Sequence, residues 1–271
     1  MTKRLPKILC IGAQKAGTSW LYENLRRNPI IWTPPFKELH FFDFKYFEES
    51  KRWARWHVRS SVKRTLKRPD TADEQKPYLR SLMEEPILNG NWYRKAFVPM
   101  PEGSVGFDAT PEYCSVPEEG IAFLKKFLSD PFIVYIIRDP LQRALSQVRM
   151  NMHRKKWDYS DDEAWMEAAM DPVIASRGDY RSFIARWDRG FPNVLYLPFG
   201  AIAENPNEVL RSVEQHCGLP PGRYETAHER VFGTVRVETP GKVLDHLLLK
   251  VDEQTSFLRE RFGTDFLFQT T

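Results

Sequence analysis

Short apolar runs separated by longer amphipathic stretches make up most of the chain. Residues 8–11 and 132–137 are the clearest runs; both are too short for a helix, and the second is rich in β-branched residues, as buried strands are. Residues 104–108 and 193–197 are two further strand candidates. Because helical patterns alternate with these runs, the sequence predicts an α/β fold with a mostly parallel sheet and helices on both faces.

The amphipathic stretches predict helices from residue 18 to the end of the chain. The first helix opens at Thr18 and Ser19, and Trp20 and Leu25 lie on its apolar face. No repeat, low-complexity segment or linker interrupts the pattern, so we expect one domain of 271 residues with a helical, basic and aromatic insert at about residues 44–101. The remaining predicted helices span residues 45–67, 78–83, 92–98, 117–128, 141–153, 161–170, 180–189, 206–217 and 252–262.

Composition narrows the class of protein. A hydrophobic fraction of 42% and a charged fraction of 28% are ordinary for a globular protein, and no apolar run reaches the length of a membrane span. The cysteines Cys10, Cys114 and Cys217 are far apart and odd in number, which favours a reducing compartment and argues against a metal site. Since the N-terminus lacks a signal-peptide pattern, we expect a cytoplasmic protein.

Charge and aromatic residues are concentrated in the insert. Although the formal net charge is only +4, residues 51–68 contain eight Lys and Arg residues and no acid. This stretch is either a solvated helix face or a rim that attracts an anionic partner. Trp53 and Trp56, expected at apolar positions of the helix over residues 45–67, and Trp92 either pack as a satellite core or bind sugar rings and planar natural products.

The loop after the first strand, Gly12-Ala-Gln-Lys-Ala-Gly17, has the features of an anion cradle. Glycines let a phosphate approach the backbone, and the free N–H groups of a helix start converge on the same place. A Walker A loop has Lys directly after its second glycine, whereas here Thr18 takes that position and Lys15 lies inside the loop. Nucleotide hydrolysis is therefore not the first expectation. The alternative to an anion site is a structural glycine turn with a solvated lysine.

A second phosphate signal follows the strand over residues 132–137. Arg138 comes directly after it, where ligands gather in open α/β sheets, and Ser146 lies eight residues further on. Arg grips phosphate in a bidentate manner and Ser adds a hydroxyl donor. Asp139 invites comparison with a magnesium-binding Walker B Asp, but Asp-Pro is also a common helix start. Together with the Lys15 loop, Arg138 predicts a bound nucleotide rather than a surface ion pair.

Titratable groups also cluster in the segment KELHFFDF, residues 37–44. We expect Glu38, His40 and Asp43 to lie close together at a strand-like or turning edge. A carboxylate among aromatic side chains has a basicity suited to general-base work, which favours Glu38 as a base. His40 is the second choice because its reference pKa is nearer neutral, or else it is a packed imidazole bonded to backbone.

Five segments carry a family resemblance: IGAQKAGTSWLYENLRRNP, KELHFFD, TPEY, RDPLQRALSQ and FPNVLYLPFGAIAENPNEVLRSVEQHCGL. Together they resemble the sulfotransferases that use PAPS (3′-phosphoadenosine 5′-phosphosulfate), particularly the branch of the heparan sulfate sulfotransferases and their bacterial relatives. The resemblance implies a P-loop-like sheet, PAPS as sulfuryl donor, PAP (adenosine 3′,5′-bisphosphate) as product, and no metal. It also implies a carbohydrate or small-molecule acceptor with a hydroxyl group and no nucleic-acid partner.

The resemblance assigns roles to single residues. It implies that Lys15 stabilises the leaving phosphate, that Glu38 is the general base, and that His40 and Asp43 lie beside it. Asp43 and Asp108 are the candidates for contacts with the acceptor. The 3′-phosphate is expected at Arg138 and Ser146, and the 5′-phosphosulfate and adjoining part of the cofactor at Lys15, Ala16, Gly17, Thr18, Ser19 and Trp20.

The chain departs from the heparan sulfate enzymes at two positions. Ser19 stands where they have Arg, and Ala109 where they have Lys, so we expect a different, less anionic acceptor. The residue that completes the nucleotide site late in the chain is either Arg236 or Lys242. Two other functions remain open: a P-loop nucleotide kinase, and a protein that binds PAP or PAPS without turnover.

Overall fold

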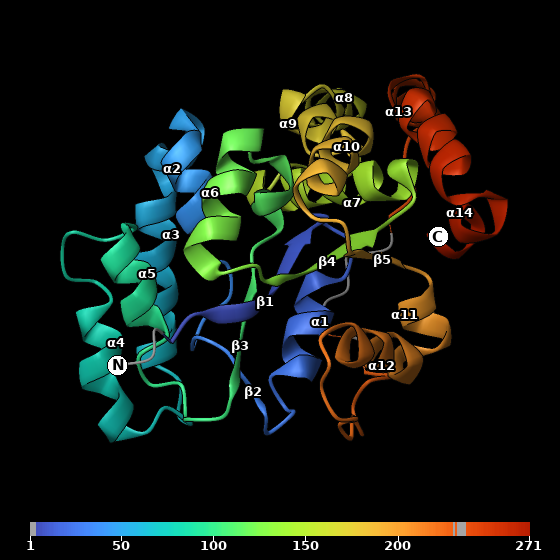
Figure 1. The fold of residues 1–271 in the computed structure, drawn as a ribbon. Coiled ribbons are helices and arrows are strands. Elements are labelled where there is room, and N and C mark those ends of the chain that lie inside the picture. The colour runs from blue at the N-terminus through green and yellow to red at the C-terminus, as the bar shows by residue number, and fades with distance from the viewer. Residues whose placement is uncertain (1–3, 230, 232–236) are drawn as a thin grey trace.

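A five-stranded parallel sheet lies at the centre of the computed structural model, with the strand order β2-β3-β1-β4-β5 (Figure 1). The structure describes residues 4–229, 231 and 237–271. The predicted parallel α/β fold is confirmed, and β2, only two residues long, is the strand that the sequence pattern did not predict. The strands are β1 (Pro6–Gly12), β2 (Ile31–Trp32), β3 (Val105–Ala109), β4 (Phe132–Ile137) and β5 (Val194–Pro198).

Helices cover both faces of this sheet. In Figure 1, α1 and α12 lie on one side and α6, α7 and α10 on the other. The helices before β4 are α1 (Thr18–Leu25), α2 (Phe41–Tyr46), α3 (Glu48–Leu66), α4 (Lys76–Ser81), α5 (Gly90–Ala96) and α6 (Glu118–Leu128), with 3-10 turns at Asp73–Gln75 and Pro111–Ser115. Those after β4 are α7 (Pro140–Lys155), α8 (Asp162–Ala169), α9 (Pro172–Ser176), α10 (Tyr180–Gly190), α11 (Ala201–Glu204), α12 (Pro206–His216), α13 (Gly241–Phe262) and α14 (Thr264–Gln269).

The central strands carry the main core. The side chains of Ile8 and Ile11 in β1, and of Ile133 and Ile137 in β4, have no exposed surface, as expected for strands covered on both faces. A second apolar cluster joins α7, α8 and α13, with Trp165 fully buried inside it. The ends of β1 and β4 are therefore fixed by packing, and the loops that follow them start from rigid positions.

The insert differs from its predicted form in one place. The helix expected over residues 45–67 is broken at Phe47, whose backbone is extended (φ −118°, ψ 124°), and this break separates α2 from α3. Ala54, Val58 and Val62 form the buried face of α3. Trp56 points away from that face and is 69% exposed, so it does not pack in a satellite core, which was one of the two expected alternatives.

The tail differs more. Helix α13 begins at Gly241, eleven residues before the predicted start. The sequence pattern did not reveal these first turns because apolar residues occur both at buried positions, Val243 and Leu247, and at exposed ones, Leu248 and Leu249. Lys242 lies in the first turn of α13, whereas Arg236 falls outside the described residues. Helices α9, α11 and α14 were not predicted, and each has six residues or fewer.

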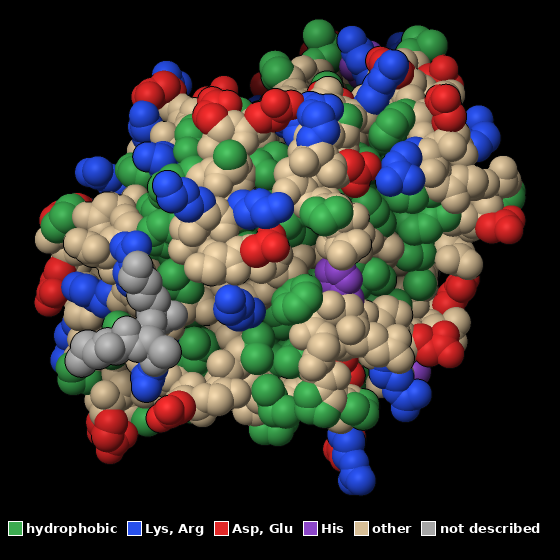
Figure 2. All heavy atoms as spheres, in the orientation of Figure 1, with side chains coloured by type: hydrophobic (Ala, Val, Ile, Leu, Met, Phe, Trp, Pro, Cys, Tyr) green, Lys and Arg blue, Asp and Glu red, His purple; other side chains and the backbone are tan. Residues whose placement is uncertain are grey.

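Charge is mixed over the surface. Lys and Arg side chains are interspersed with Asp and Glu on the face shown in Figure 2. Within the described part of the chain, no helix combines the length and the apolar character needed to cross a membrane. Cys10, Cys114 and Cys217 are all free and buried.

Candidate active site

The loop between β1 and α1 is held tightly against the end of β4. The backbone N–H of Ala13 donates to the carbonyl of Ile136, with 2.8 Å between nitrogen and oxygen. Gly17, the residue before α1, has φ +83°, and a Cβ built there would lie 2.7 Å from Cδ1 of Ile202. Both the left-handed backbone and the lack of space require glycine at this position. The loop therefore presents the start of α1 in one fixed orientation.

Lys15 and Arg138 meet across this loop. A guanidinium N–H of Arg138 donates to the backbone carbonyl of Lys15 at 2.7 Å, and the same guanidinium lies 4.4 Å from the ring centre of Phe199. The Lys15 ammonium lies 3.7 Å from the sulfur of Met150 in α7. Among the described residues, neither cation forms an ion pair with a carboxylate. The two cations predicted from the sequence are thus neighbours, and neither is paired with a carboxylate of the described residues.

Partial burial of the two cations lowers their pKa values. The pKa of Lys15 is lowered to about 8, mainly by burial and to a smaller extent by the charges of Arg138 and Arg154. Burial likewise lowers the pKa of Arg138 to about 10. Partial burial makes the charged forms of both side chains less favourable, and a bound anion would offset this cost. The chemistry of the site therefore fits phosphate or phosphosulfate.

Helix α7 carries Ser146, the remaining predicted phosphate ligand, and begins directly after Asp139. Ser146 is buried, and it lies one helical turn before Met150, so both side chains lie on the α7 face that meets Lys15. Asp139 caps α7, because its carboxylate accepts the backbone N–H of Gln142 at 2.8 Å. This contact gives Asp139 the helix-start role rather than that of a magnesium ligand.

Trp20 lies differently from the rest of the predicted loop residues. Its side chain is buried, and its indole N–H donates to the carbonyl of Ala227 at 2.8 Å. The indole is therefore a packing and anchoring group of α1, and only its backbone remains available near the loop. Ala16, Thr18 and Ser19 lie at the helix start as predicted.

The segment KELHFFDF forms a turn that leads into α2. Glu38 and His40 have positive φ values of 69° and 53°, so of the two forms expected for this edge the chain adopts the turning one. Two buried hydrogen bonds hold the turn: the backbone N–H of Leu39 donates to the hydroxyl of Thr110 at 3.0 Å, and that of Phe41 donates to the phenol of Tyr113 at 3.2 Å. The TPEY segment thus fixes the turn in place.

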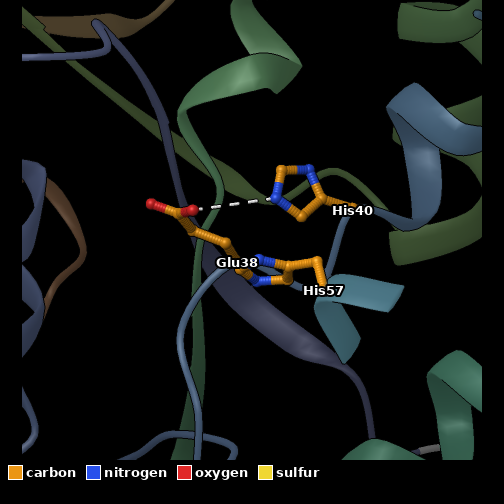
Figure 3. A group of neighbouring side chains, drawn as sticks. All are labelled: Glu38, His40 and His57. Atoms are coloured by element: carbon orange, nitrogen blue, oxygen red, sulfur yellow. Dashed lines mark ion pairs between the residues drawn. The ribbon is translucent and has the colours of Figure 1, made fainter. Parts of the chain in front are cut away.

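Inside this turn Glu38, His40 and Asp43 come together. Figure 3 shows Glu38 and His40 of this group. Nδ1 of His40 lies 3.1 Å from Asp43, and its Nε2 lies 3.7 Å from Glu38. Burial opposes the charge of His40, but the Asp43 carboxylate outweighs it and holds the pKa of His40 well above its usual value. His40 is therefore a charged bridge between two carboxylates.

Glu38 is a weaker base than the sequence predicted, because of its charged neighbours. Burial raises the pKa of Glu38, but Lys37 and His40 together more than offset this effect and hold it well below its usual value. Lys37 was missed in the sequence. Its ammonium donates to Glu38 at 2.8 Å and to the hydroxyl of Thr18 at 3.0 Å, so it joins the carboxylate turn to the first turn of α1.

Two more residues near the turn were also missed. His57 of α3 has its ring centre 4.8 Å from that of His40, although nothing in the basic stretch around it marks it as different. Glu112, the Glu of TPEY, accepts hydrogen bonds from Gln14 at 3.0 Å and from Arg177 at 3.2 Å. Gln14 belongs to the phosphate loop, so Glu112 is a second link between the two halves of the site.

Asp108, predicted to contact the acceptor, is buried in the interior. Its carboxylate accepts hydrogen bonds from the hydroxyls of Tyr93 and Thr110 at 2.8 Å and of Tyr113 at 3.1 Å. Burial raises its pKa to about 6 against these three donors. Asp43 is 1% exposed and bonded to His40. Both carboxylates are buried and hydrogen-bonded to neighbouring side chains, so we do not propose them as acceptor ligands.

Comparison with known proteins identifies the family of the chain. The sequence model of the sulfotransferase family matches residues 6–223. The chain belongs to the sulfotransferase family. Heparan sulfate glucosamine 3-O-sulfotransferase 3A1 of Mus musculus is 24% identical over 226 residues, and 3B1 of Homo sapiens is 22% identical over the same length. Each match covers 80% of this chain and 47% of the relative, so this sulfotransferase spans about half the length of the curated relatives it matches.

Solved structures show the same fold. The sulfotransferase from Alicyclobacillus acidocaldarius superimposes with a TM-score of 0.61 at 19% identity, covering 98% of this chain and 94% of that one. The sulfotransferase domain from the Synechococcus PCC 7002 olefin synthase gives 0.53 at 14% identity, covering 98% and 92%. At these identities the likeness concerns the fold alone.

Proposed function

We propose that this sulfotransferase uses PAPS and transfers its sulfuryl group to a hydroxyl of a carbohydrate or small natural product. The observation that carries the proposal is the 2.7 Å contact between Arg138 and the backbone of Lys15, which brings together two half-buried cations without a carboxylate partner among the described residues. Such a pair suits a nucleotide with phosphate groups at both ends of its ribose.

In this proposal the two cations divide the nucleotide between them. Arg138 and Ser146 hold the 3′-phosphate. Lys15 and the backbone N–H groups at the start of α1, from Ala16 to Ser19, hold the 5′-phosphosulfate, aided by the positive end of the helix. Family membership supports PAPS as donor, and the charge of the site supports binding without a metal.

Glu38 acts as the general base of the proposed reaction. The acceptor oxygen forms a bond to sulfur while its proton moves to Glu38, and the bond from sulfur to the bridging phosphate oxygen breaks, leaving PAP. Lys15 stabilises the charge that builds on that oxygen. Lys37 ties Glu38 to Thr18, so base and phosphate loop keep a fixed separation. His40 positions Glu38 through the ion pair between its Nε2 and the Glu38 carboxylate.

The test combines nucleotide binding with sulfate transfer. We expect PAP to bind the wild-type protein in calorimetry without magnesium, and labelled sulfate to pass from PAPS to at least one hydroxyl acceptor in a panel of saccharides and phenols. Lys15→Ala should weaken PAP binding and Glu38→Ala should abolish transfer, whereas the exposed Lys126→Ala control should do neither.

Each rival function has its own outcome in that experiment. Full transfer by Lys15→Ala or Glu38→Ala would remove the role assigned to that residue. PAP binding without transfer to any acceptor would identify a binding protein. ATP binding that requires magnesium, with no PAP binding, would identify a nucleotide kinase and overturn the proposal.

A further inference from the structure

We propose that Glu38, His40 and His57 form a binding site for a divalent transition-metal ion such as Zn²⁺, and that the bound ion blocks the base of the transfer reaction. The blocking effect rests on the function proposed above, whereas the metal site itself does not. This proposal departs from the absence of a metal that the sequence led us to expect.

The geometry of the three side chains is close to that of a metal site. One ligand atom from each lies within 4.8 Å of the others. Zinc bonds of about 2.0–2.1 Å at tetrahedral angles place neighbouring ligand atoms about 3.3 Å apart. Nε2 of His40 and a carboxylate oxygen of Glu38 are already 3.7 Å apart. Figure 3 shows that the side chains converge from the turn and from α3, so small side-chain rotations complete the site.

Two ring nitrogens of this group form no hydrogen bond in the described structure. Nε2 of His40 and Nε2 of His57 are both buried without a hydrogen bond, and the His40 side chain is only 1% exposed. A buried polar atom without a partner is unfavourable. A single metal ion binds both nitrogens at once, which no hydrogen bond between described residues does. Because the ion takes the Nε2 lone pair of His40, the proton that the charged imidazole carries there is released to solvent on binding.

The remaining atoms of two ligands are anchored in the manner of metal sites. Nδ1 of His40 faces Asp43 at 3.1 Å, and the other oxygen of Glu38 accepts from Lys37 at 2.8 Å. A carboxylate behind a ligating imidazole fixes the orientation of the ring and strengthens it as a ligand. Asp43 is therefore assigned as the outer-shell support of His40.

The ligand set selects the class of ion. Two imidazole nitrogens and one carboxylate oxygen suit zinc and its first-row neighbours, and such three-residue sites leave a fourth position for water. Calcium and magnesium prefer oxygen ligands, so they are poor candidates. An ion bound here takes the carboxylate lone pair that would otherwise accept the proton of the acceptor hydroxyl.

The first experiment measures metal binding alone. Zn²⁺ is titrated calorimetrically into chelator-stripped protein, and one ion per chain is expected to bind. His57→Gln and Glu38→Gln should each weaken binding at least about tenfold, while the exposed His153→Gln control leaves it unchanged. Thermal unfolding checks that each variant is folded. No binding by the wild type, or unchanged affinity in both site variants, would overturn the metal site.

The second experiment separates the site from the reaction. With a competent acceptor, Zn²⁺ should inhibit wild-type sulfate transfer reversibly on addition of chelator, and His57→Gln should be inhibited less relative to its own metal-free rate. Transfer that ignores saturating Zn²⁺ would refute the blocking effect. If Zn²⁺ binds through His57 but the metal-free protein transfers no sulfate, the metal site stands, and the proposed function and the blocking effect both fall.

Discussion

The two halves of the candidate site treat charge in opposite ways. On the side proposed to bind the nucleotide, which we call the nucleotide side, Lys15 and Arg138 lie together without a carboxylate partner among the described residues, and the pKa of each is lowered. On the side proposed to bind the acceptor, which we call the acceptor side, the charges alternate, because Lys37 contacts Glu38, Glu38 lies near His40, and His40 contacts Asp43. One half carries unbalanced positive charge, and the other is close to neutral.

This difference separates binding from positioning. Unbalanced charge on half-buried groups is unfavourable until an anion binds, so the proposed nucleotide side gains most from its ligand. Alternating charges offset one another in sign before any ligand binds. Lys37 connects the halves, because it also donates to Thr18 at the phosphate loop. The comparison therefore predicts that mutations in the two halves affect different measured quantities.

The largest effect is expected on the acceptor side. Glu38→Gln keeps the shape of the side chain but removes its ability to accept a proton, so sulfate transfer should fall about 10²- to 10⁴-fold. PAP affinity should change little, because the phosphate contacts lie on the other half. Steady-state rates with PAPS and calorimetry with PAP check both statements. A large loss of PAP affinity with an unchanged rate would reverse the assignment of the two halves.

The next effect belongs to the nucleotide side. Arg138→Ala removes a half-buried guanidinium from the proposed 3′-phosphate, so PAP affinity should fall by about 3 kcal/mol, or roughly 100-fold. Arg138→Lys retains the charge without the bidentate geometry, so its PAP affinity should lie between those of the wild type and Arg138→Ala. Calorimetric titration with PAP measures the series. Equal affinity in all three proteins would place the 3′-phosphate elsewhere.

Much of the fold could be predicted because it depends on local patterns. Strand β4 matches its predicted bounds, since residues 132–137 form an apolar run that a polar Arg138 ends. Helix α13 was predicted at half its length, because Leu248 and Leu249 are exposed and break the apolar period. Strand β2 has two residues and leaves no periodic signal. The errors lie where tertiary packing or short length overrides the pattern.

The site divides in the same way. Lys15, Arg138 and Glu38 could be identified because each follows a strand or lies in a motif. The pKa of Glu38 could not, because it depends on the side-chain position of Lys37. His57 could not be identified either, since it reaches His40 only through the packing of α3 against the turn. Sequence shows which groups are present, but not which groups balance them.

A smaller effect is expected on stability. Asp43→Asn removes the partner that raises the pKa of His40 and should cost about 2 kcal/mol of unfolding free energy at pH 6. A histidine with a raised folded pKa is stabilising below about pH 6.5, its unfolded pKa, and loses that contribution as pH rises through the folded pKa. The difference from wild type should therefore shrink towards pH 9. Urea unfolding at both pH values tests this, and a gap that widens with pH would contradict the charged His40.

The smallest effect comes from Lys15, whose lowered pKa of about 8 makes nucleotide binding depend on pH. PAP binding favours the charged ammonium and raises its pKa, so affinity is full below pH 8 and falls above it as the free protein loses the proton. We expect binding about tenfold weaker at pH 9 than at pH 7, with proton uptake near pH 8.5 visible as a dependence on the ionisation enthalpy of the buffer. Lys15→Arg stays charged and should flatten the profile. A flat profile in the wild type would show that Lys15 already carries its full charge at pH 9, and would remove the imbalance that distinguishes the nucleotide side from the acceptor side.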